Sequence, residues 1–511
     1  MQLTTLLRDS RALAALAVPL VLTQLAQVAL TTTDTVMMGM LSTEALAAGG
    51  LALVIFNQLR TMGAGLITAV GNQVAAAAAR AELPAPARQS GPTSEAEPPG
   101  PATRSGPASQ DVPPGSAGQS TPHSRAEADG EVRTLVRAAL ALATLAGVGG
   151  GILMLLIGQA VAFLGQDAAV VSRAQGMLLA LAPGLVPCLW FQAIRQFTVG
   201  MRRPQALLRI TIASVAVNAG LNWALIHGSW GLPKLGLPGI GVATSTVYAL
   251  SFLALYASAR RDPALGPLLS LRVWRADTRT LRKLLGLGIP IAATYGSEAG
   301  FFSVTALMAG SFGPAALAAH TAVNQLVYLV FQVSVGLSHA ASIHVSRELA
   351  LGEAESVQRA GARRIRNAAL ACGGAVMALV GLGYLALPRL VLRPFFDPAV
   401  PADAQALTIA TGLLAVVAVL QFFDCAQNIG VGLLRGLDDT RSGFRITLVG
   451  YWLIGLPAAW LLAYPLNAGT RGVWLGLLTG LAATAVLLLR RYDRTLTIRQ
   501  SSPLAAPATQ H

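Results

Sequence analysis

This sequence has few charged residues for its length. Asp, Glu, Lys and Arg make up only 12% of its 511 residues, whereas 54% are hydrophobic. A soluble globular domain carries about 25% charged residues, so this deficit excludes an ordinary soluble domain. The long apolar blocks that fill the chain are instead typical of helices in a lipid bilayer.

Other absences narrow the function. The three cysteines, Cys188, Cys372 and Cys425, lack the spacing of a metal site or redox motif, so we interpret them as packing residues. No GxxxxGK[ST] motif is present, which excludes a P-loop ATPase, and no Ser-His-Asp or HExxH arrangement is found. We therefore expect that the protein is not an enzyme and needs no cofactor. Any transport it performs would be powered by an ion gradient.

The net charge of +14 does not indicate a nucleic-acid partner. Basic residues lie in short loops between apolar spans, not on one amphipathic face. Twelve apolar stretches are long enough to cross a bilayer as helices, which predicts an all-α integral membrane protein. They lie at about 13–38, 46–73, 134–158, 173–199, 206–228, 238–259, 284–311, 317–343, 367–390, 405–433, 442–464 and 471–489. The first run is too long for a signal-peptide core, so we predict a retained helix.

Basic residues predict the orientation of these spans. With twelve spans both termini lie on one side, and five basic residues fall in loops on the other: Arg173, Lys234, Arg389, Arg393 and Arg471. Arg60 lies within a span, which leaves 31 of the 37 basic residues on the side of the termini. The positive-inside rule places that side in the cytoplasm. We expect a multi-pass membrane protein with both termini in the cytoplasm.

One loop differs from the rest. Residues 82–130 hold ten of the 28 prolines, together with much Gly, Ser and Glu. Such a composition buries too little apolar surface to order itself. We predict a disordered cytoplasmic insert, and we interpret it as flexible filler rather than as a binding motif.

The chain repeats itself without a gap across two predicted helices. Pro19 and Pro290 lie 271 positions apart, and Gly65 and Gly336 share this offset. Farther on, Gly200 matches Gly436 at an offset of 236. We predict two six-helix lobes of the same topology, an N-lobe at 1–260 and a C-lobe at 261–511. Transporters are often built from such repeats, with the binding site between the halves near the midplane.

Asp34 stands in the apolar and hydroxylic run VLTQLAQVALTTTDTVMMGM. An acid within a span costs a few kcal/mol on insertion scales and is a functional hypothesis by default. One alternative is a structural acid held by neighbouring threonines, or paired with Arg60 or an asparagine. We favour a carboxylate that binds and releases a proton or another cation. Asn218 and Asn222 are four residues apart and share one face of their helix.

Glu298 and Asp424 lie mid-span in the second half. Two nearby carboxylates repel each other, and a bound monovalent cation relieves that repulsion; hard cations prefer oxygen ligands. The alternative is two independent proton sites or hydrogen-bonded acids. Among the other ionisable residues, we interpret Arg60 as a structural partner of an acid and Arg195 as a helix-end or interlobe contact. His320, His339 and His344 are interpreted as helix-end residues.

At these residues the chain resembles the MATE (multidrug and toxic compound extrusion) family, and within it the NorM branch. The similarity covers nearly the whole chain except the insert and the ends. Its most specific pieces are TDTVMMG, VNAGLNW, GIGVAT, GIPIAATYGSE, LAAHTAVNQ and QFFDCAQNIGVGLLRG.

The resemblance implies an antiporter that exports cationic lipophilic compounds in exchange for Na+ or H+. It implies that Asp34, Asn218, Asn222 and Thr244 form a substrate and proton site, and that Glu298 and Asp424 bind the coupling cation, with Na+ as the metal. One position departs from the pattern: close NorM relatives have a tyrosine where this chain has Leu420. The alternative is a lipid-linked precursor flippase of the wider superfamily, which predicts a strongly cationic cavity.

Overall fold

The computed structural model describes residues 2–82, 122–161, 168–351, 355–396 and 401–498. Every regular element in these ranges is a helix, as predicted. The first half comprises α1 (Gln2–Leu41), α2 (Thr43–Arg80), α3 (Pro122–Ala160), α4 (Ala168–Gly200), α5 (Gln205–His227) and α6 (Leu237–Arg261). Two short 3-10 turns, η2 (Gly266–Leu268) and η3 (Val273–Arg275), connect it to the second half. The second half comprises α7 (Thr278–Gly310), α8 (Pro314–Ala350), α9 (Glu355–Ala386), α10 (Pro388–Leu392), α11 (Pro401–Gly436), α12 (Thr440–Leu448), η4 (Val449–Gly455), α13 (Leu456–Ala463) and α14 (Gly469–Ile498).

Among the described residues, eleven helical segments are long and apolar enough to cross a membrane, with α12, η4 and α13 forming one of them. The remaining predicted span lies in α7, whose first turns carry Arg279, Arg282 and Lys283.

Asp277 caps α7 by accepting hydrogen bonds from the Thr280 hydroxyl and N–H at 2.7 and 2.8 Å. These bonds stabilise the ionised carboxylate and hold the pKa of Asp277 below its usual value.

The predicted end of the proline-rich insert is wrong. Helix α3 begins at Pro122, so residues 122–130 are helical. The cause is packing: Ala128 and Val132, four residues apart, are both buried, and Glu131 forms a 2.6 Å ion pair with Arg80 of α2. The rest of the insert, 83–121, lies outside the described residues.

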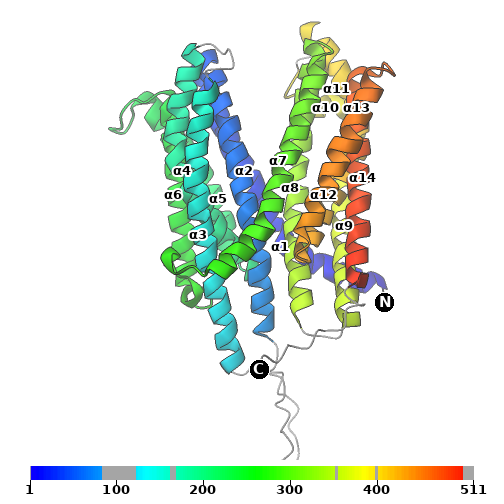
Figure 1. Ribbon diagram of the computed structural model, residues 1–511. Coiled ribbons are helices and arrows are strands. Elements are labelled where there is room, and N and C mark those ends of the chain that lie inside the picture. The colour runs from blue at the N-terminus through cyan, green and yellow to red at the C-terminus, as the bar shows by residue number, and fades with distance from the viewer. Residues whose placement is uncertain (1, 83–121, 162–167, 352–354, 397–400, 499–511) are drawn as a thin grey trace, which may run out of the picture.

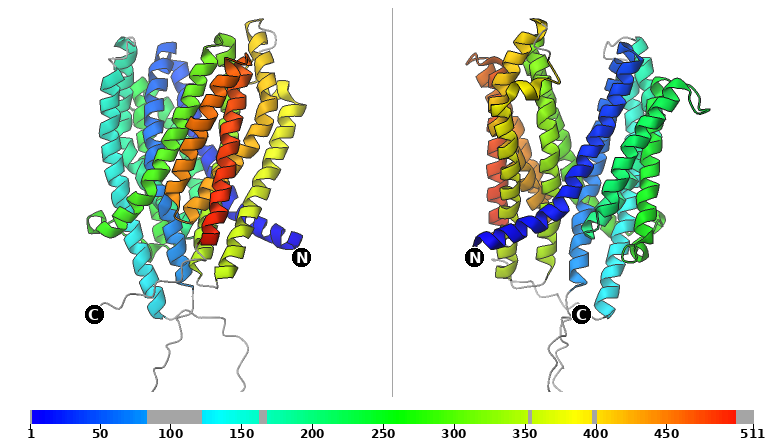
Figure 2. Two further views of the ribbon diagram at one scale, coloured as in Figure 1. Left: turned by 45° about the vertical axis from the view of Figure 1, so that its right-hand side comes forward. Right: turned by 180° about the vertical axis from the view of Figure 1, so that it is seen from behind.

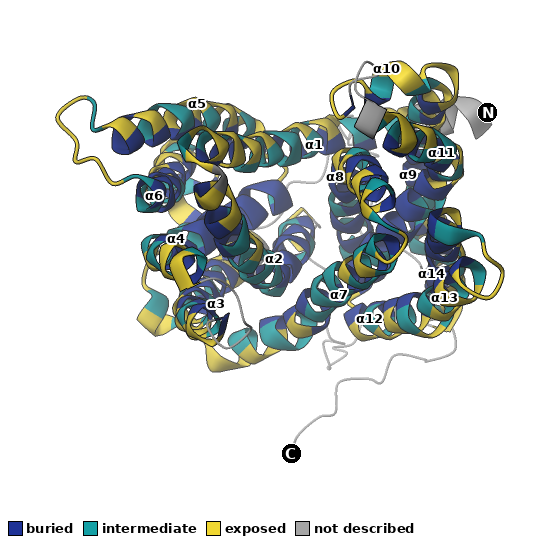
Figure 3. Ribbon diagram, turned by 90° about the horizontal axis from the view of Figure 1, so that it is seen from above, coloured by how far each residue is buried: buried dark blue, intermediate teal, exposed yellow. Residues whose placement is uncertain are grey.

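The two halves diverge toward one end of the molecule and meet toward the other (Figures 1 and 2). The first turns of α1 and the last turn of α14 lie toward the end where the halves meet. Seen from above, α1, α2, α7 and α8 lie between the two groups of helices (Figure 3). There α2 contacts α7 and α8, and α1 contacts α8 and α9. Large apolar side chains also face outward, among them Leu307 and Leu379 at 75% and 73% exposure, as expected of helices surrounded by lipid.

The repeat is visible in equivalent proline sites of α1 and α7. A proline within a helix leaves the carbonyl four residues earlier without its N–H donor and bends the helix. Thr23 Oγ1 donates to Pro19 O at 2.7 Å, and Thr294 Oγ1 donates to Pro290 O at 2.8 Å. Both pairs obey the 271-residue offset. Figure 2 shows that the N-terminal part of α1 crosses toward the second half of the molecule.

The crossings of these helices are equivalent as well. A Cβ atom added to Gly65 of α2 would lie 2.9 Å from Ala292 Cα of α7. A Cβ atom added to Gly336 of α8 would lie 3.0 Å from the backbone nitrogen of Val21 in α1. Val21 and Ala292 are themselves 271 positions apart. Glycine at both positions therefore allows the same close helix approach in each direction between the two halves.

Candidate functional site

The residues predicted around Asp34 lie together in the first half. Asn222 Nδ2 of α5 donates to Asp34 Oδ1 at 2.7 Å, and Thr244 Oγ1 of α6 donates to Asp34 Oδ2 at 2.9 Å. Asn218 completes the cluster: its Oδ1 accepts from Asn222 at 3.1 Å, and its Nδ2 lies 3.5 Å from Thr244 Oγ1. The four side chains come from α1, α5 and α6, and each is at most 2% exposed. We call them the N-lobe cluster.

The neighbouring threonines do not hold Asp34. Thr31, Thr32, Thr33 and Thr35 each donate to the backbone carbonyl four residues earlier in α1. Asp34 forms no ion pair with any basic side chain among the described residues. Its carboxylate is therefore held by neutral donors alone. Asn222 Oδ1 is also buried, with no hydrogen-bond partner in the described part of the chain.

The two acids of the second half also converge, through a shared amide. Gln427 Nε2 lies 3.5 Å from Glu298 Oε1 of α7 and 3.4 Å from Asp424 Oδ1 of its own helix, α11. Asn428 Nδ2 donates to the same Asp424 oxygen at 3.3 Å. Glu298 and Asp424 are 9% and 3% exposed. We call Glu298, Asp424, Gln427, Asn428 and Tyr451 the C-lobe cluster.

Tyr451 joins this cluster from a seven-residue π-helical turn, η4. Its hydroxyl lies 3.3 Å from Glu298 Oε1 and donates to Gln427 Oε1 at 3.0 Å. Its ring stacks on Phe301, with centroids 4.9 Å apart. π-Helical turns often occur at functional sites because they shift the register of a helix. Leu420, the position that departs from the family pattern, is instead a buried member of the apolar core.

Sequence reasoning missed Gln427, Asn428 and Tyr451. Gln427 and Asn428 follow Asp424 by three and four residues, so helix geometry places them beside it, and that signal was available. Tyr451 is 153 residues from Glu298 in the chain, and only packing brings them together. No group of three or more His, Cys, Asp or Glu among the described residues could hold a metal ion. A cation between Glu298 and Asp424 would take its other oxygens from neutral side chains.

Among the remaining ionisable residues, Arg60 and the three histidines differ from expectation, whereas Arg195, five residues before the end of α4, interacts with Tyr295 and His339 of the second half. Arg60 has no acidic partner in the described part of the molecule; its Nε donates to Asn57 Oδ1 at 3.2 Å. Arg195 is buried, and its Nη1 donates to Gln192 Oε1 within α4 at 3.2 Å. The three histidines, His320, His339 and His344, are not helix-end residues, because α8 extends beyond the predicted span at both ends. Both added flanks are packed: Ala316 is buried, and Ser346 Oγ donates to Gly436 O of α11 at 3.1 Å.

A third polar group connects the two halves at the end where they meet. Asn72 Nδ2 of α2 donates to Ser342 Oγ of α8 at 2.8 Å and to the backbone oxygen of Arg435 in α11 at 3.1 Å. Gln73 Nε2 donates to Asp438 Oδ1 at 2.9 Å, and Lys283 Nζ donates to Gln73 Oε1 at 2.6 Å. We call Asn72, Gln73, Lys283, Ser342, Arg435 and Asp438 the interlobe network. No pattern in the sequence predicted this network.

Comparisons with known proteins agree with this architecture. The MatE family model matches residues 126–224 and 290–461, more than half of the chain. A protein of Pseudomonas aeruginosa named "Probable multidrug resistance protein NorM" is 34% identical, covering 95% of this chain and 89% of that protein. Its namesake in Pseudomonas syringae pv. tomato is 33% identical, covering 94% and 93%.

Solved structures show the same fold. The eukaryotic MATE transporter AtDTX14 superposes with a TM-score of 0.74 at 18% identity, covering 97% of this chain and 99% of that one. A MATE structure in the bent conformation gives 0.78 at 15% identity, covering 98% of both.

Fold and comparisons together define the class: a multi-spanning membrane transporter built from two six-helix halves, and not an enzyme. Within that class, the chain belongs to the MATE family.

Proposed function

We propose that this protein is a secondary antiporter that exports cationic, lipophilic compounds in exchange for Na+ or H+. Asp34 carries the proposal. It is 1% exposed, and its hydrogen-bond donors, Asn222 and Thr244, are both neutral. An ionised carboxylate buried without a cationic partner costs several kcal/mol. A proton, an alkali cation or an organic cation would each remove that cost.

Exchange of substrate for coupling ion would follow if both cations compete for the same carboxylate, Asp34. In a low-dielectric site, two cations near the same carboxylate repel each other strongly. Entry of the coupling ion from outside therefore favours release of the cationic substrate. On the cytoplasmic side, entry of the substrate favours release of the coupling ion. The name of the Pseudomonas aeruginosa relative, a probable multidrug resistance protein, supports drugs as substrates.

The C-lobe cluster supports a second ion site. Glu298 and Asp424 approach a common amide, Gln427, and Tyr451 adds a phenol oxygen. Carboxylate, amide and phenol oxygens suit a hard monovalent cation. Protonation of either acid would relieve their repulsion equally well, so the coupling ion is Na+ or H+.

Transport also requires the site to open alternately to each side. The interlobe network holds the halves together at the end carrying the first turns of α1 and the last turn of α14. We place this end in the cytoplasm of a bacterial inner membrane, because the sequence topology assigns 31 of the 37 basic residues to the side of the termini. We take the monomer as the working unit. The network would then break when the site opens to the cytoplasm.

Ethidium efflux from proteoliposomes, driven separately by imposed Na+ and pH gradients, tests the proposal. Asp34→Asn keeps the shape of the side chain but removes its charge. We expect at least a tenfold loss of efflux, with an unchanged size-exclusion profile, because the neutral amide no longer favours a cation. Glu44→Gln is the matched control, since Glu44 is an exposed acid at the start of α2, paired with Arg173 at 3.0 Å.

The gradient that drives wild-type efflux identifies the coupling ion. If neither gradient drives efflux, the protein is not an ion-coupled exporter of this substrate. If folded Asp34→Asn pumps as well as Glu44→Gln, Asp34 is a structural acid.

A further inference from the structure

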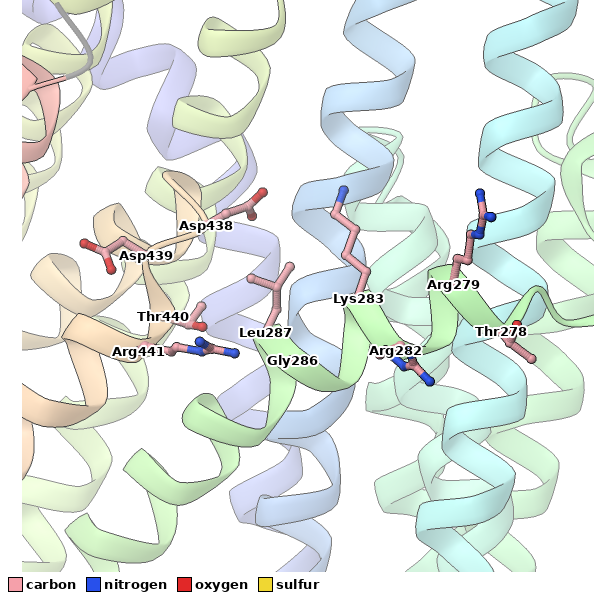
Figure 4. Close-up of a pocket in the computed structure, with 10 residues that line it drawn as sticks. All are labelled: Thr278, Arg279, Arg282, Lys283, Gly286, Leu287, Asp438, Asp439, Thr440 and Arg441. Atoms are coloured by element: carbon pink, nitrogen blue, oxygen red, sulfur yellow. The ribbon is translucent and has the colours of Figure 1, made fainter. Parts of the chain in front are cut away.

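A cationic pocket lies between the first turns of α7 and the start of α12, apart from both carboxylate clusters (Figure 4). Its volume is about 870 Å³, within the range of roughly 300–1,000 Å³ typical of ligand sites. Four basic residues line it: Arg279, Arg282, Lys283 and Arg441. In Figure 4 the side chains of Arg282 and Arg441 lie on either side of Gly286.

The two acids that line the pocket are already engaged elsewhere. Asp438 accepts two hydrogen bonds from Gln73 Nε2, at 2.9 and 3.0 Å. Asp439 forms a 2.9 Å ion pair with Arg491 of α14. Arg282 and Arg441 are exposed and form no ion pair or hydrogen bond with a described residue. Two uncommitted guanidinium groups thus face the same space.

The start of α12 adds polar groups that also lack partners. Its N-cap residue, Asp439, gives no side-chain cap to the helix. Thr440 is 6% exposed, and its hydroxyl has no hydrogen-bond partner among the described residues. Figure 4 shows that this hydroxyl points from α12 toward α7. A helix N-terminus with an unpaired hydroxyl and two free guanidinium groups suits a phosphate group.

An apolar pocket adjoins the cationic one and shares Arg441 with it. Its volume is about 290 Å³, and apart from Arg441 it is lined by Ile289, Pro290, Ala293, Phe444 and Arg445 along the same two helices. Ile289 is 56% exposed, so this wall is open to the surroundings of the helices. A charged pocket that shares a lining residue with a mainly apolar one matches a lipid headgroup joined to its acyl chain, not a free anion. Basic pockets between membrane helices on the cytoplasmic side are known to suit anionic headgroups.

We propose that this paired pocket binds an anionic phospholipid, with the phosphate between Arg282, Arg441 and Thr440 and the start of an acyl chain against Phe444 and Ile289. Gly286 keeps the headgroup space open, because a Cβ atom added there would meet nothing within 4 Å. The same fact provides a test variant: Gly286→Leu would fill the pocket without disturbing a neighbour or any charge.

Native mass spectrometry of the purified protein, titrated with phosphatidylglycerol or phosphatidylcholine, tests the site. We expect at least tenfold tighter binding of phosphatidylglycerol. Arg282→Gln with Arg441→Gln, and separately Gly286→Leu, should reduce that binding to the phosphatidylcholine level. Arg209→Gln is the matched control: Arg209 is an exposed arginine near the start of α5, outside the pocket, and its loss should change nothing.

Three outcomes would overturn the proposal. The first is equal binding of the two lipids. The second is equal loss in the pocket variants and in Arg209→Gln, which would show a general effect of surface charge. The third is competition by glycerol 3-phosphate as strong as by phosphatidylglycerol, which would show a free-anion site in which the apolar pocket takes no part.

Discussion

Tyr451 shows how a single hydroxyl organises the C-lobe cluster. It reaches Glu298 and Gln427 together, and Gln427 in turn reaches Asp424. Two acids on different helices are thereby joined by neutral groups. This arrangement allows both carboxylates to respond to one bound cation, because moving Gln427 changes the surroundings of each.

Replacing Tyr451 with phenylalanine separates the hydroxyl from the ring. The ring can keep its stack on Phe301, whereas Glu298 and Gln427 lose their hydrogen bonds. We expect the concentration of coupling ion for half-maximal efflux to rise about tenfold, about 1.4 kcal/mol, with little change in the thermal midpoint. Efflux assays at varied ion concentration measure the half-maximal concentration, and thermal unfolding in detergent measures the thermal midpoint.

Tyr384→Phe is the control, since Tyr384 is a buried tyrosine of the same half with no hydrogen bond to a described carboxylate. Equal behaviour of the two variants would remove Tyr451 from the ion site.

At the scale of elements, α2 and α8 hold the two halves together through the interlobe network. Asn72 both donates to and accepts from Ser342, at 2.8 and 3.1 Å. Arg435 is 2% exposed, and its guanidinium donates to Ser342 and Ser338 rather than to an acid. Each charged member of the network that bonds through its side chain, Lys283, Arg435 or Asp438, is bonded to an amide or a hydroxyl and not to an opposite charge. Such hydrogen bonds cost less to break than a buried ion pair. A contact of this kind suits two states of similar free energy.

Asn72→Ala tests the network. Losing its hydrogen bonds leaves Ser342 and the Arg435 carbonyl with fewer partners, which costs about 1–3 kcal/mol in this conformation. We expect the ratio of closed to open molecules at this end to fall by about five- to 150-fold. Spin labels at Arg80→Cys in α2 and Arg363→Cys in α9, in a background without native cysteines, would report a longer distance.

The control is Gln421→Leu. Gln421 Nε2 donates to Met377 O at 2.8 Å, a buried hydrogen bond within one half. If both variants shift the distance equally, a general loosening explains the result and the network is not a gate.

At the scale of the whole molecule, the two halves share a fold but not a site. The 271-residue offset pairs Asp34 with Thr305 and Glu298 with Gln27, so neither acid has an acidic counterpart. The helix crossings at Gly65 and Gly336 are equivalent nonetheless. The repeat therefore keeps the packing of the helices but not the acids, and the N-lobe and C-lobe clusters are chemically different.

The orientation of the molecule can be tested through two exposed positions in a background without native cysteines. The two substitutions are Lys234→Cys, in the loop between α5 and α6, and Arg261→Cys, at the last residue of α6. We expect a membrane-impermeant maleimide to label position 234 in intact cells and position 261 only after lysis, because the excess of basic residues keeps the termini inside. The reverse pattern would contradict both the topology and the cytoplasmic placement of the interlobe network.

The sequence by itself determined the membrane environment, the helical class, the two-fold repeat and the acids worth examining. These follow from local composition and from spacing, since apolar runs of about 20 residues form spanning helices whatever their neighbours. Helical spacing paired Asn218 with Asn222, and the resemblance added Thr244 and linked all three to Asp34. The structure places the three residues around Asp34.

Only the tertiary structure decided which groups meet. It placed Tyr451 beside Glu298 and joined Asn72 to Ser342 across 270 residues. It left Arg60 without an acidic partner in the described part of the chain and extended α3 back to Pro122. The reason is physical: contacts between helices depend on crossing angles, bends and side-chain packing, and helical periodicity specifies a face of a helix but not what lies against it.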